Sequence, residues 1–143
     1  MKINMRKLGI DYGDSRVGIA ISDALGITAQ GLETIHHNGN DKIVLKRLEE
    51  IVAEYEIDTF VIGMPYNMNG TLGDRIEVTK KFINKLKCKF NKIKITEIDE
   101  RLTTVAAHKT MNFLDINKQK KRNIVDTISA VYILEIYLNR KEN

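Results

Sequence analysis

The run DTFVIGM at residues 58–64 is the feature that most constrains the fold, because it is continuously apolar from Phe60 onward. A strand with one face in solvent alternates apolar and polar residues, whereas a strand buried on both faces reads as an unbroken apolar run. We therefore predict a buried, parallel strand near the centre of a sheet. This strand indicates an α/β fold.

Further strands are predicted on both sides of this run. Residues 7–35 combine β-branched residues with glycine-containing turns, a pattern typical of three antiparallel strands joined by hairpins. Residues 92–98, KIKITEI, alternate as one more strand. Together with the predicted helices, this order indicates a mixed α/β layout without an internal repeat.

Two helices are predicted between these strands. Apolar residues recur at helical spacing over 44–55, and Asn40 or Asp41 is suited to cap that helix. The second helix is expected to open at Asp74, with Glu77 three residues later completing a capping box. Its predicted buried stripe consists of three apolar residues, Val78, Phe82 and Leu86.

Two more helices are predicted in the last third of the chain. One runs from Thr103 or Thr104, either of which is suited to cap it, to Phe113. The other spans residues 123–138 and is apolar almost all round, so it should be buried against the sheet. Residues 115–123, DINKQKKRN, have high charge and no apolar periodicity, and we expect a mobile loop there.

Length and composition favour one globular domain. The 143 residues match the usual size of a domain, and 43% hydrophobic with 29% charged residues is close to the globular average. Cys88 is the only cysteine, which excludes an internal disulfide, and the first residues lack the apolar run of a signal peptide. With no apolar stretch long enough to span a membrane, we expect a single domain over residues 1–143 in the cytoplasm.

The basic residues are concentrated in one part of the chain. Residues 80–122 contain 13 Lys and Arg against 4 Asp and Glu, which is +9, whereas the remainder has 10 against 15, which is −5. Clustered basic residues release counterions when they neutralise phosphates, so this asymmetry favours a nucleic-acid partner. A solvated helix surface is an alternative explanation of the same lysines.

Several acids stand where an isolated carboxylate would be costly. Asp11 ends the first predicted strand, and Asp126 lies in the first turns of the apolar final helix. Asp99 and Glu100 follow the last strand, next to Arg101. A buried carboxylate needs a charged partner, hydrogen bonds or a metal. Structural alternatives exist for each: an Asx turn at the first strand, a strand-end salt bridge, and the dipole of the final helix.

These acids can converge, because the ends of two strands and the start of a buried helix can meet at the carboxyl edge of a sheet. A cluster of carboxylate oxygens suits hard divalent cations such as Mg2+ or Mn2+. Two such ions stabilise both the attacking and the leaving oxygen of a phosphodiester. The pattern therefore indicates metal-assisted hydrolysis of nucleic acid.

Other kinds of site are less consistent with the sequence. Residues 13–18 have Walker-like glycine spacing, but Ile19 and Ala20 follow where a P-loop requires Lys and Ser or Thr. His36 and His37 are adjacent and are interpreted as loop surface, and no Cys or His cluster has zinc spacing. Cys88 is interpreted as a structural residue, since no basic partner is evident.

Four motifs resemble one known family. They are GIDYGDSRVGIAISD at 9–23, FVIGMPYNMNGTLGDR at 60–75, DERLTT at 99–104 and VDTISAVYIL at 125–134. Their order and spacing resemble the YqgF/RuvX family of Holliday-junction-resolvase-like proteins, also called pre-16S rRNA nucleases. The resemblance implies a ribonuclease-H-like fold with a five-stranded mixed sheet, the first three strands antiparallel. It also implies a metal-dependent nuclease acting on the 5′ end of pre-16S rRNA.

The resemblance assigns the catalytic and metal-binding acids to three positions, Asp11, Glu100 and Asp126. It thus favours Glu100 over Asp99, which the strand pattern does not distinguish because Ile98 disturbs the alternation. It also places four residues near the acids, in phosphate contact or support: Arg16, Arg101, Thr103 and Thr104. Independently, the basic charge predicts nucleic-acid contacts from Lys118, Lys120, Lys121 and Arg122.

Ser129 marks a departure from related proteins. Related junction resolvases carry a second acid one helical turn after the last aspartate, and here that position is Ser129. Fewer carboxylates should bind a second metal less tightly, which favours simple hydrolysis over junction resolution. We therefore interpret the chain as a Mg2+- or Mn2+-dependent nuclease of structured RNA, with pre-16S rRNA in a ribosomal precursor as its partner.

Two alternatives remain open. One is a Holliday junction resolvase acting on DNA, and the other is a non-catalytic RNA-binding factor that assists ribosome assembly. An actin-like nucleotide-binding domain also begins with a strand followed by an Asp-Gly turn, but its two lobes do not fit into 143 residues.

Overall fold

A five-stranded sheet forms the centre of the protein. The computed structural model describes residues 5–66, 69, 73–102 and 118–140, with side chains of the last range described from Val125 onward. The strands are β1 (Arg6–Tyr12), β2 (Arg16–Ser22), β3 (Ala29–His36), β4 (Ile57–Met64) and β5 (Lys94–Asp99). Their order is β3-β2-β1-β4-β5, with β1, β2 and β3 antiparallel and β4 parallel to both β1 and β5. This confirms the expected mixed sheet.

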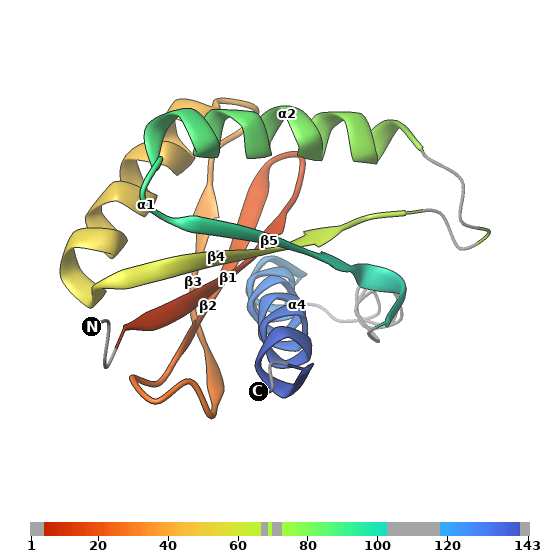
Figure 1. The fold of residues 1–143 in the computed structure, drawn as a ribbon. Helices are drawn as coiled ribbons and strands as arrows, with labels where there is room; N and C mark the ends of the chain where they lie inside the picture. Colours follow the sequence, from red (N-terminus) through yellow and green to blue (C-terminus); the bar gives the residue numbers. More distant parts are fainter. Residues whose placement is uncertain (1–4, 67–68, 70–72, 103–117, 141–143) are drawn as a thin grey trace.

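Helices cover both faces of the sheet (Figure 1). The helices α1 (Asp41–Tyr55) and α2 (Asp74–Lys89) lie on one face, and α4 (Lys118–Arg140) lies on the other. Because side chains alternate along a strand, each strand contributes to two separate cores. On β1, Leu8 and Ile10 belong to the core beneath α1 and α2, while Gly9 and Asp11 face α4.

The strand β4 is the buried parallel strand that the apolar run predicts. Phe60, Val61 and Ile62 are fully buried. Phe60 and Ile62 pack beneath α1 and α2, whereas Val61 packs beneath α4. A strand with a core on each face needs apolar residues at successive positions, which is why the run does not alternate. It lies beside β1, which holds the central place in the sheet.

Both helices begin where expected, but the capping box predicted for the second does not form. The side chain of Asn40 caps α1 by accepting a hydrogen bond from the backbone N–H of Lys42. At α2 the capping residue is Gly73, which has no side chain to complete a capping box, so that prediction is wrong. Asp74 and Glu77 instead lie in the first turn, where carboxylates interact favourably with the helix dipole.

The buried stripe of α2 also differs from the prediction. Phe82 and Leu86 are buried as expected, but Val78 is 40% exposed. Thr79 and Ile76 are buried instead, because the helix is rotated so that its inner face passes through them.

The helix α4 begins at Lys118, five residues before the predicted start at residue 123. The expected loop over 115–123 is therefore wrong for residues 118–123, and 115–117 lie outside the described residues. Lys, Gln and Arg favour helix without any apolar face, so the absence of apolar periodicity does not exclude helix. The helix predicted from Thr103 or Thr104 to Phe113 also lies outside the described part of the chain. None of the described helices is long and apolar enough to cross a membrane.

Candidate active site

Glycines let α4 lie directly on the sheet. A Cβ atom added at Gly9 of β1 would lie 2.7 Å from the carbonyl oxygen of Ala130 and 2.8 Å from the Cβ of Leu134. One added at Gly18 of β2 would lie 3.0 Å from the Cβ of Asp126. Any larger residue at Gly9 or Gly18 would push the helix away, so these two glycines set the height of Asp126 above the sheet.

Asp11 and Asp126 lie on the same side of the sheet at this contact. Asp11 pairs with Gly18 in the antiparallel register, and paired residues direct their side chains to the same face of a sheet. Asp126 lies over Gly18, so both carboxylates occupy the same side, between β1 and α4. They are only 3% and 7% exposed. Two acids far apart in sequence thus meet in a nearly dry environment.

Glu100 approaches Asp11 from the opposite flank. The parallel register runs from Gly9–Val61 to Ile10–Ile62, and its continuation places Gly63 of β4 beside Asp11. A Cβ atom added at Gly63 would lie 2.8 Å from Oε2 of Glu100, so this carboxylate lies over Gly63. Glu100 begins the short 3-10 helix η1 (Glu100–Leu102), directly after β5. Asp11 is therefore flanked by two glycines, with another acid above each.

The structure separates Glu100 from Asp99. Asp99 pairs with Met64, which packs beneath α1 and α2, so Asp99 faces away from α4. The Arg101 guanidinium donates to both carboxylate oxygens of Asp99, at 3.0 and 2.6 Å, and these bonds lower the pKa of that carboxyl. Ile98 packs beneath α4, in the second core, which explains why it disturbs the alternation.

Of the two arginines assigned to this site, one lies at the acids. Arg16 donates from Nε to Oδ2 of Asp126 at 2.7 Å, where both side chains are largely buried. Arg101 instead pairs with Asp99, with its guanidinium 5.5 Å from the ring centre of Tyr66. Arg16 therefore offsets the charge of the carboxylate of Asp126.

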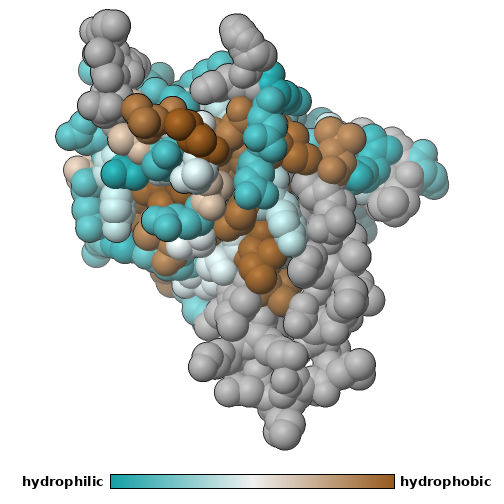
Figure 2. All heavy atoms as spheres, turned by 90° about the horizontal axis from the view of Figure 1, so that it is seen from below, coloured by the Kyte–Doolittle hydropathy of each residue, from teal (hydrophilic) through white to brown (hydrophobic). Residues whose placement is uncertain are grey.

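The remaining residues assigned to the site lie outside the part of the chain whose side chains are described. Thr103 and Thr104 lie outside the described residues. The four basic residues Lys118, Lys120, Lys121 and Arg122 lie in the first turns of α4, before the part whose side chains are described. Seen from the α4 side, the described surface shows hydrophobic patches among hydrophilic residues (Figure 2). Among the described side chains, Arg16 is the cation that the structure brings to the acids.

His37 corrects the interpretation of the histidine pair as loop surface. His36 is exposed, but His37 is 1% exposed and its ring stacks on Tyr12. Its Nδ1 accepts from the backbone N–H of Gly39 at 3.0 Å, and its Nε2 lies 2.9 Å from the carbonyl oxygen of Gly13. Nδ1 as acceptor leaves Nε2 as the donor to Gly13. His37 thus holds the turn that follows Asp11, a role that sequence analysis missed.

The three acids have the donor chemistry that a hard divalent cation requires, because all supply carboxylate oxygens on one face. In the described part of the chain, no three His, Cys, Asp or Glu side chains yet enclose a common point for a metal. Arg16 occupies an oxygen of Asp126 that would otherwise be available as a ligand. Asp11, Glu100 and Asp126 are the residues of this face whose oxygens would hold a divalent metal.

The mixed sheet and its helical layers form a domain of ribonuclease-H-like fold. The same fold occurs in Thermus thermophilus RuvC bound to a Holliday junction substrate, with a TM-score of 0.60, 11% identity and 95% of each chain covered. It also occurs in the yeast mitochondrial Holliday junction resolvase, with a TM-score of 0.56, 9% identity, and 96% of this chain and 79% of that chain covered. Residues 5–140 match the RuvX family, described as Holliday junction resolvase, and the chain belongs to this family.

Curated relatives cover nearly the whole chain. A protein of Acetivibrio thermocellus is 54% identical, covering 96% of this chain and 97% of its own length. One of Ruminiclostridium cellulolyticum is 56% identical, covering 95% of each. Both carry the name "Putative pre-16S rRNA nuclease". The resemblance inferred from the motifs is thus confirmed.

Proposed function

We propose that the protein is a metal-dependent nuclease that hydrolyses phosphodiester bonds of structured RNA and matures the 5′ end of pre-16S rRNA in ribosomal precursors. Residues 1–143 act as one nuclease domain in the cytoplasm, where such precursors are processed. The observation that carries this proposal is the placement of Asp11 between two glycines, with Asp126 above one and Glu100 above the other. The name of the relatives supports the choice of substrate.

In this proposal the acids are the metal ligands and Arg16 is a movable cation. Asp11 is fixed on the central strand, and Asp126 and Glu100 reach it from α4 and from η1. Bound Mg2+ or Mn2+ supplies Lewis-acid chemistry, activating a water and stabilising charge on the phosphodiester. Arg16, once released from Asp126, is placed to contact the anionic phosphate.

The buried position of Ser129 supports hydrolysis of RNA over resolution of DNA junctions. Ser129 lies one turn after Asp126 and is fully buried, and its hydroxyl has no hydrogen-bond partner among the described atoms. The position therefore supplies no additional carboxylate. A site with three acids should hold a second cation less tightly than one with four.

The test is cleavage of a precursor 16S rRNA fragment and of a four-way DNA junction, each with Mg2+, Mn2+ or EDTA. We expect metal-dependent cutting of the RNA, lowered by orders of magnitude in Asp11→Asn, Glu100→Gln and Asp126→Asn. Asp99→Asn is the matched control, because this acid adjoins Glu100 but faces the other side of the sheet. It should retain most of the activity.

Three outcomes would contradict the proposal. Full activity in any one of the three acid variants removes that acid from the site. Cutting of the DNA junction alone would make the protein a junction resolvase. RNA binding without cleavage under every metal condition would make it an assembly factor.

A further inference from the structure

The helix α2 and the turn after it form a strongly basic surface on the face of the sheet opposite the acids. Residues 80–94 contain seven lysines and no acidic residue. All seven are exposed: Lys80, Lys81, Lys85, Lys87, Lys89, Lys92 and Lys94. α2 and α4 lie on opposite sides of the sheet (Figure 1), so this surface is separate from the acid site.

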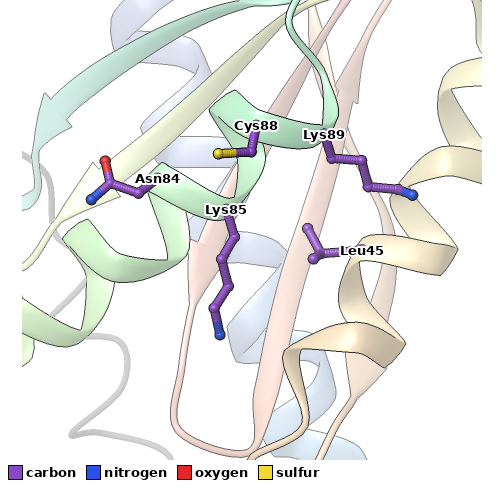
Figure 3. Close-up of a pocket in the computed structure, with 5 residues that line it drawn as sticks. All are labelled: Leu45, Asn84, Lys85, Cys88 and Lys89. Carbon is purple, nitrogen blue, oxygen red and sulfur yellow. The ribbon is translucent and has the colours of Figure 1, made fainter.

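The lysines on the α1 side of α2 are already paired. Lys85 contacts Asp41 at 3.0 Å and Lys89 contacts Glu49 at 3.6 Å, and both acids belong to α1. Figure 3 shows Lys85 and Lys89 beside the hollow between the two helices, with Leu45 of α1 facing them. These two lysines serve the contact between α1 and α2.

Two lysines on the opposite side of α2, Lys80 and Lys87, have no such partner. Residues seven apart lie on the same helix face, and this face is turned away from Lys85 and Lys89. Within the described residues, no carboxylate lies within 4.0 Å of the ammonium groups of Lys80 or Lys87. Glu77 is one turn before Lys80 and is the nearest acid along the helix, but it forms no ion pair with it. We call Lys80 and Lys87 the free lysine stripe.

We propose that the free lysine stripe binds the phosphate backbone of double-stranded RNA, as a docking surface distinct from the acid site. The choice of RNA rests on the proposed function. Lys80 and Lys87 are seven residues apart, about two helical turns or ~10 Å along the axis. Two ammonium groups at this spacing can each contact a phosphate of the same duplex.

The chemistry of the surface favours a duplex over unpaired RNA. Proteins that hold unpaired strands place exposed aromatic rings beneath the bases. The aromatic side chains of this region, Phe82 and Phe90, are buried in the core. What α2 offers to solvent is ammonium groups, which contact phosphates whatever the base sequence.

The stripe also lies at a defined place relative to the acids. Arg75, in the first turn of α2, donates from Nη2 to the carbonyl oxygen of Tyr12 at 3.1 Å, next to Asp11 in β1. From there α2 runs away from the acid site. An RNA that reaches both the acids and Lys87 must therefore be long, whereas a short substrate contacts the acids alone.

The test compares two double variants that remove the same charge from the same helix. Lys80→Gln/Lys87→Gln removes stripe lysines, and Lys85→Gln/Lys89→Gln removes paired ones. Binding of an RNA duplex is measured by fluorescence anisotropy at several salt concentrations in EDTA, so that no cleavage is involved. Each lost phosphate contact should lower the slope of log K against log salt by about 0.9.

We expect the slope of log K against log salt to be shallower by about 1.8 in the stripe variant than in wild type. The control variant should have the wild-type slope. Between 50 and 200 mM salt, wild-type affinity should therefore fall about tenfold more than that of the stripe variant. Equal slopes for the two variants would overturn the proposal. It would also be overturned if the stripe substitutions changed the slope for an unpaired RNA of the same sequence as much as they change it for the duplex. A wild-type protein that binds with the expected slopes but never cleaves would refute the nuclease and leave the docking surface standing.

Discussion

Replacing Gly9 with alanine should separate the acids by lifting α4 from the sheet. The added Cβ would lie 2.7 Å from the carbonyl oxygen of Ala130 and 2.8 Å from the Cβ of Leu134. Neither atom can rotate away, because one belongs to the helix backbone and the other is bonded to it. Ordinary van der Waals contact begins at 3.4 Å, so the helix must withdraw by at least 3.4 minus 2.7, or 0.7 Å.

This displacement should affect both stability and catalysis. Forcing an extra methyl group into a packed core costs about 1–3 kcal/mol in free energy of unfolding. Asp126 lies one turn before Ala130 and moves with the helix, while Asp11 stays on β1. Since a misplacement of about 1 Å can reduce a rate about 100-fold, we expect at least a tenfold loss of RNA cleavage.

Gly31→Ala is the control, because it adds the same methyl group beneath the same helix. There the new Cβ would lie 3.1 Å from the Cβ and 3.3 Å from Oγ1 of Thr127, so a shift of 3.4 minus 3.1, or 0.3 Å, restores ordinary contact. Stability and activity should therefore stay closer to wild type than in Gly9→Ala. The assays are urea unfolding and cleavage of precursor rRNA. If Gly9→Ala matched Gly31→Ala in both, α4 would not rest on β1 as described, and the proposed meeting of the acids would be refuted.

Two further perturbations test the charges around the site. Without added metal, Arg16→Gln should lower the free energy of unfolding by about 1–2 kcal/mol, because Asp126 loses its partner. Added Mg2+ should raise the melting temperature of this variant more than that of wild type, because no guanidinium competes for Asp126. An equal rise in the two proteins would contradict this prediction. Burial, and then the hydrogen bond to Asp41, raise the pKa of Tyr12 above its ordinary value of 10.0. Above pH 10 the tyrosine of the unfolded chain loses its proton while folded Tyr12 keeps it, so the free energy of unfolding falls as the pH rises. Below pH 10 this contribution to stability is fully present. In urea unfolding, the free energy of unfolding of Tyr12→Phe should therefore fall less above pH 10 than that of wild type.

The sequence predicted best where one residue pattern decided one structural feature. All five strands were predicted, the first three from β-branched residues and glycine turns and the last two from an apolar run and an alternating one. The placement of Asp11 and Asp126 at element ends was also readable, since a lone acid in an apolar context demands a partner. Which of Asp99 and Glu100 faces the site was not readable from the strand pattern, because β5 contributes Ile95 to one core and Ile98 to the other.

Features that depend on three-dimensional packing were missed or wrong. His37 was assigned to the surface because its neighbours are polar, but the return of the chain after β3 buries its ring against Tyr12. Cys88 was interpreted as a structural residue and is instead exposed, lining the hollow between α1 and α2. Val78 was placed in the core from its spacing to Phe82, although that spacing also fits an exposed flank. In each case, local sequence fixes the element but not its rotation against the sheet.

The first hairpin of the chain carries most of what positions the acids. Gly9 and Gly18 admit the backbone of α4, and Asp11 lies beside Gly18 in the same register. Arg16 precedes Gly18 by two residues on β2 and therefore shares its face, from which it reaches Asp126. One β-hairpin thus supplies the glycines on which α4 packs and one of the acids, Asp11. It also supplies Arg16, whose charge offsets that of Asp126 from the far end of the chain. Because carboxylates packed together repel one another, a cation beside them stabilises their arrangement. Its position on β2 thus explains both why Arg16 pairs with Asp126 and why we propose that it contacts the phosphate of the substrate.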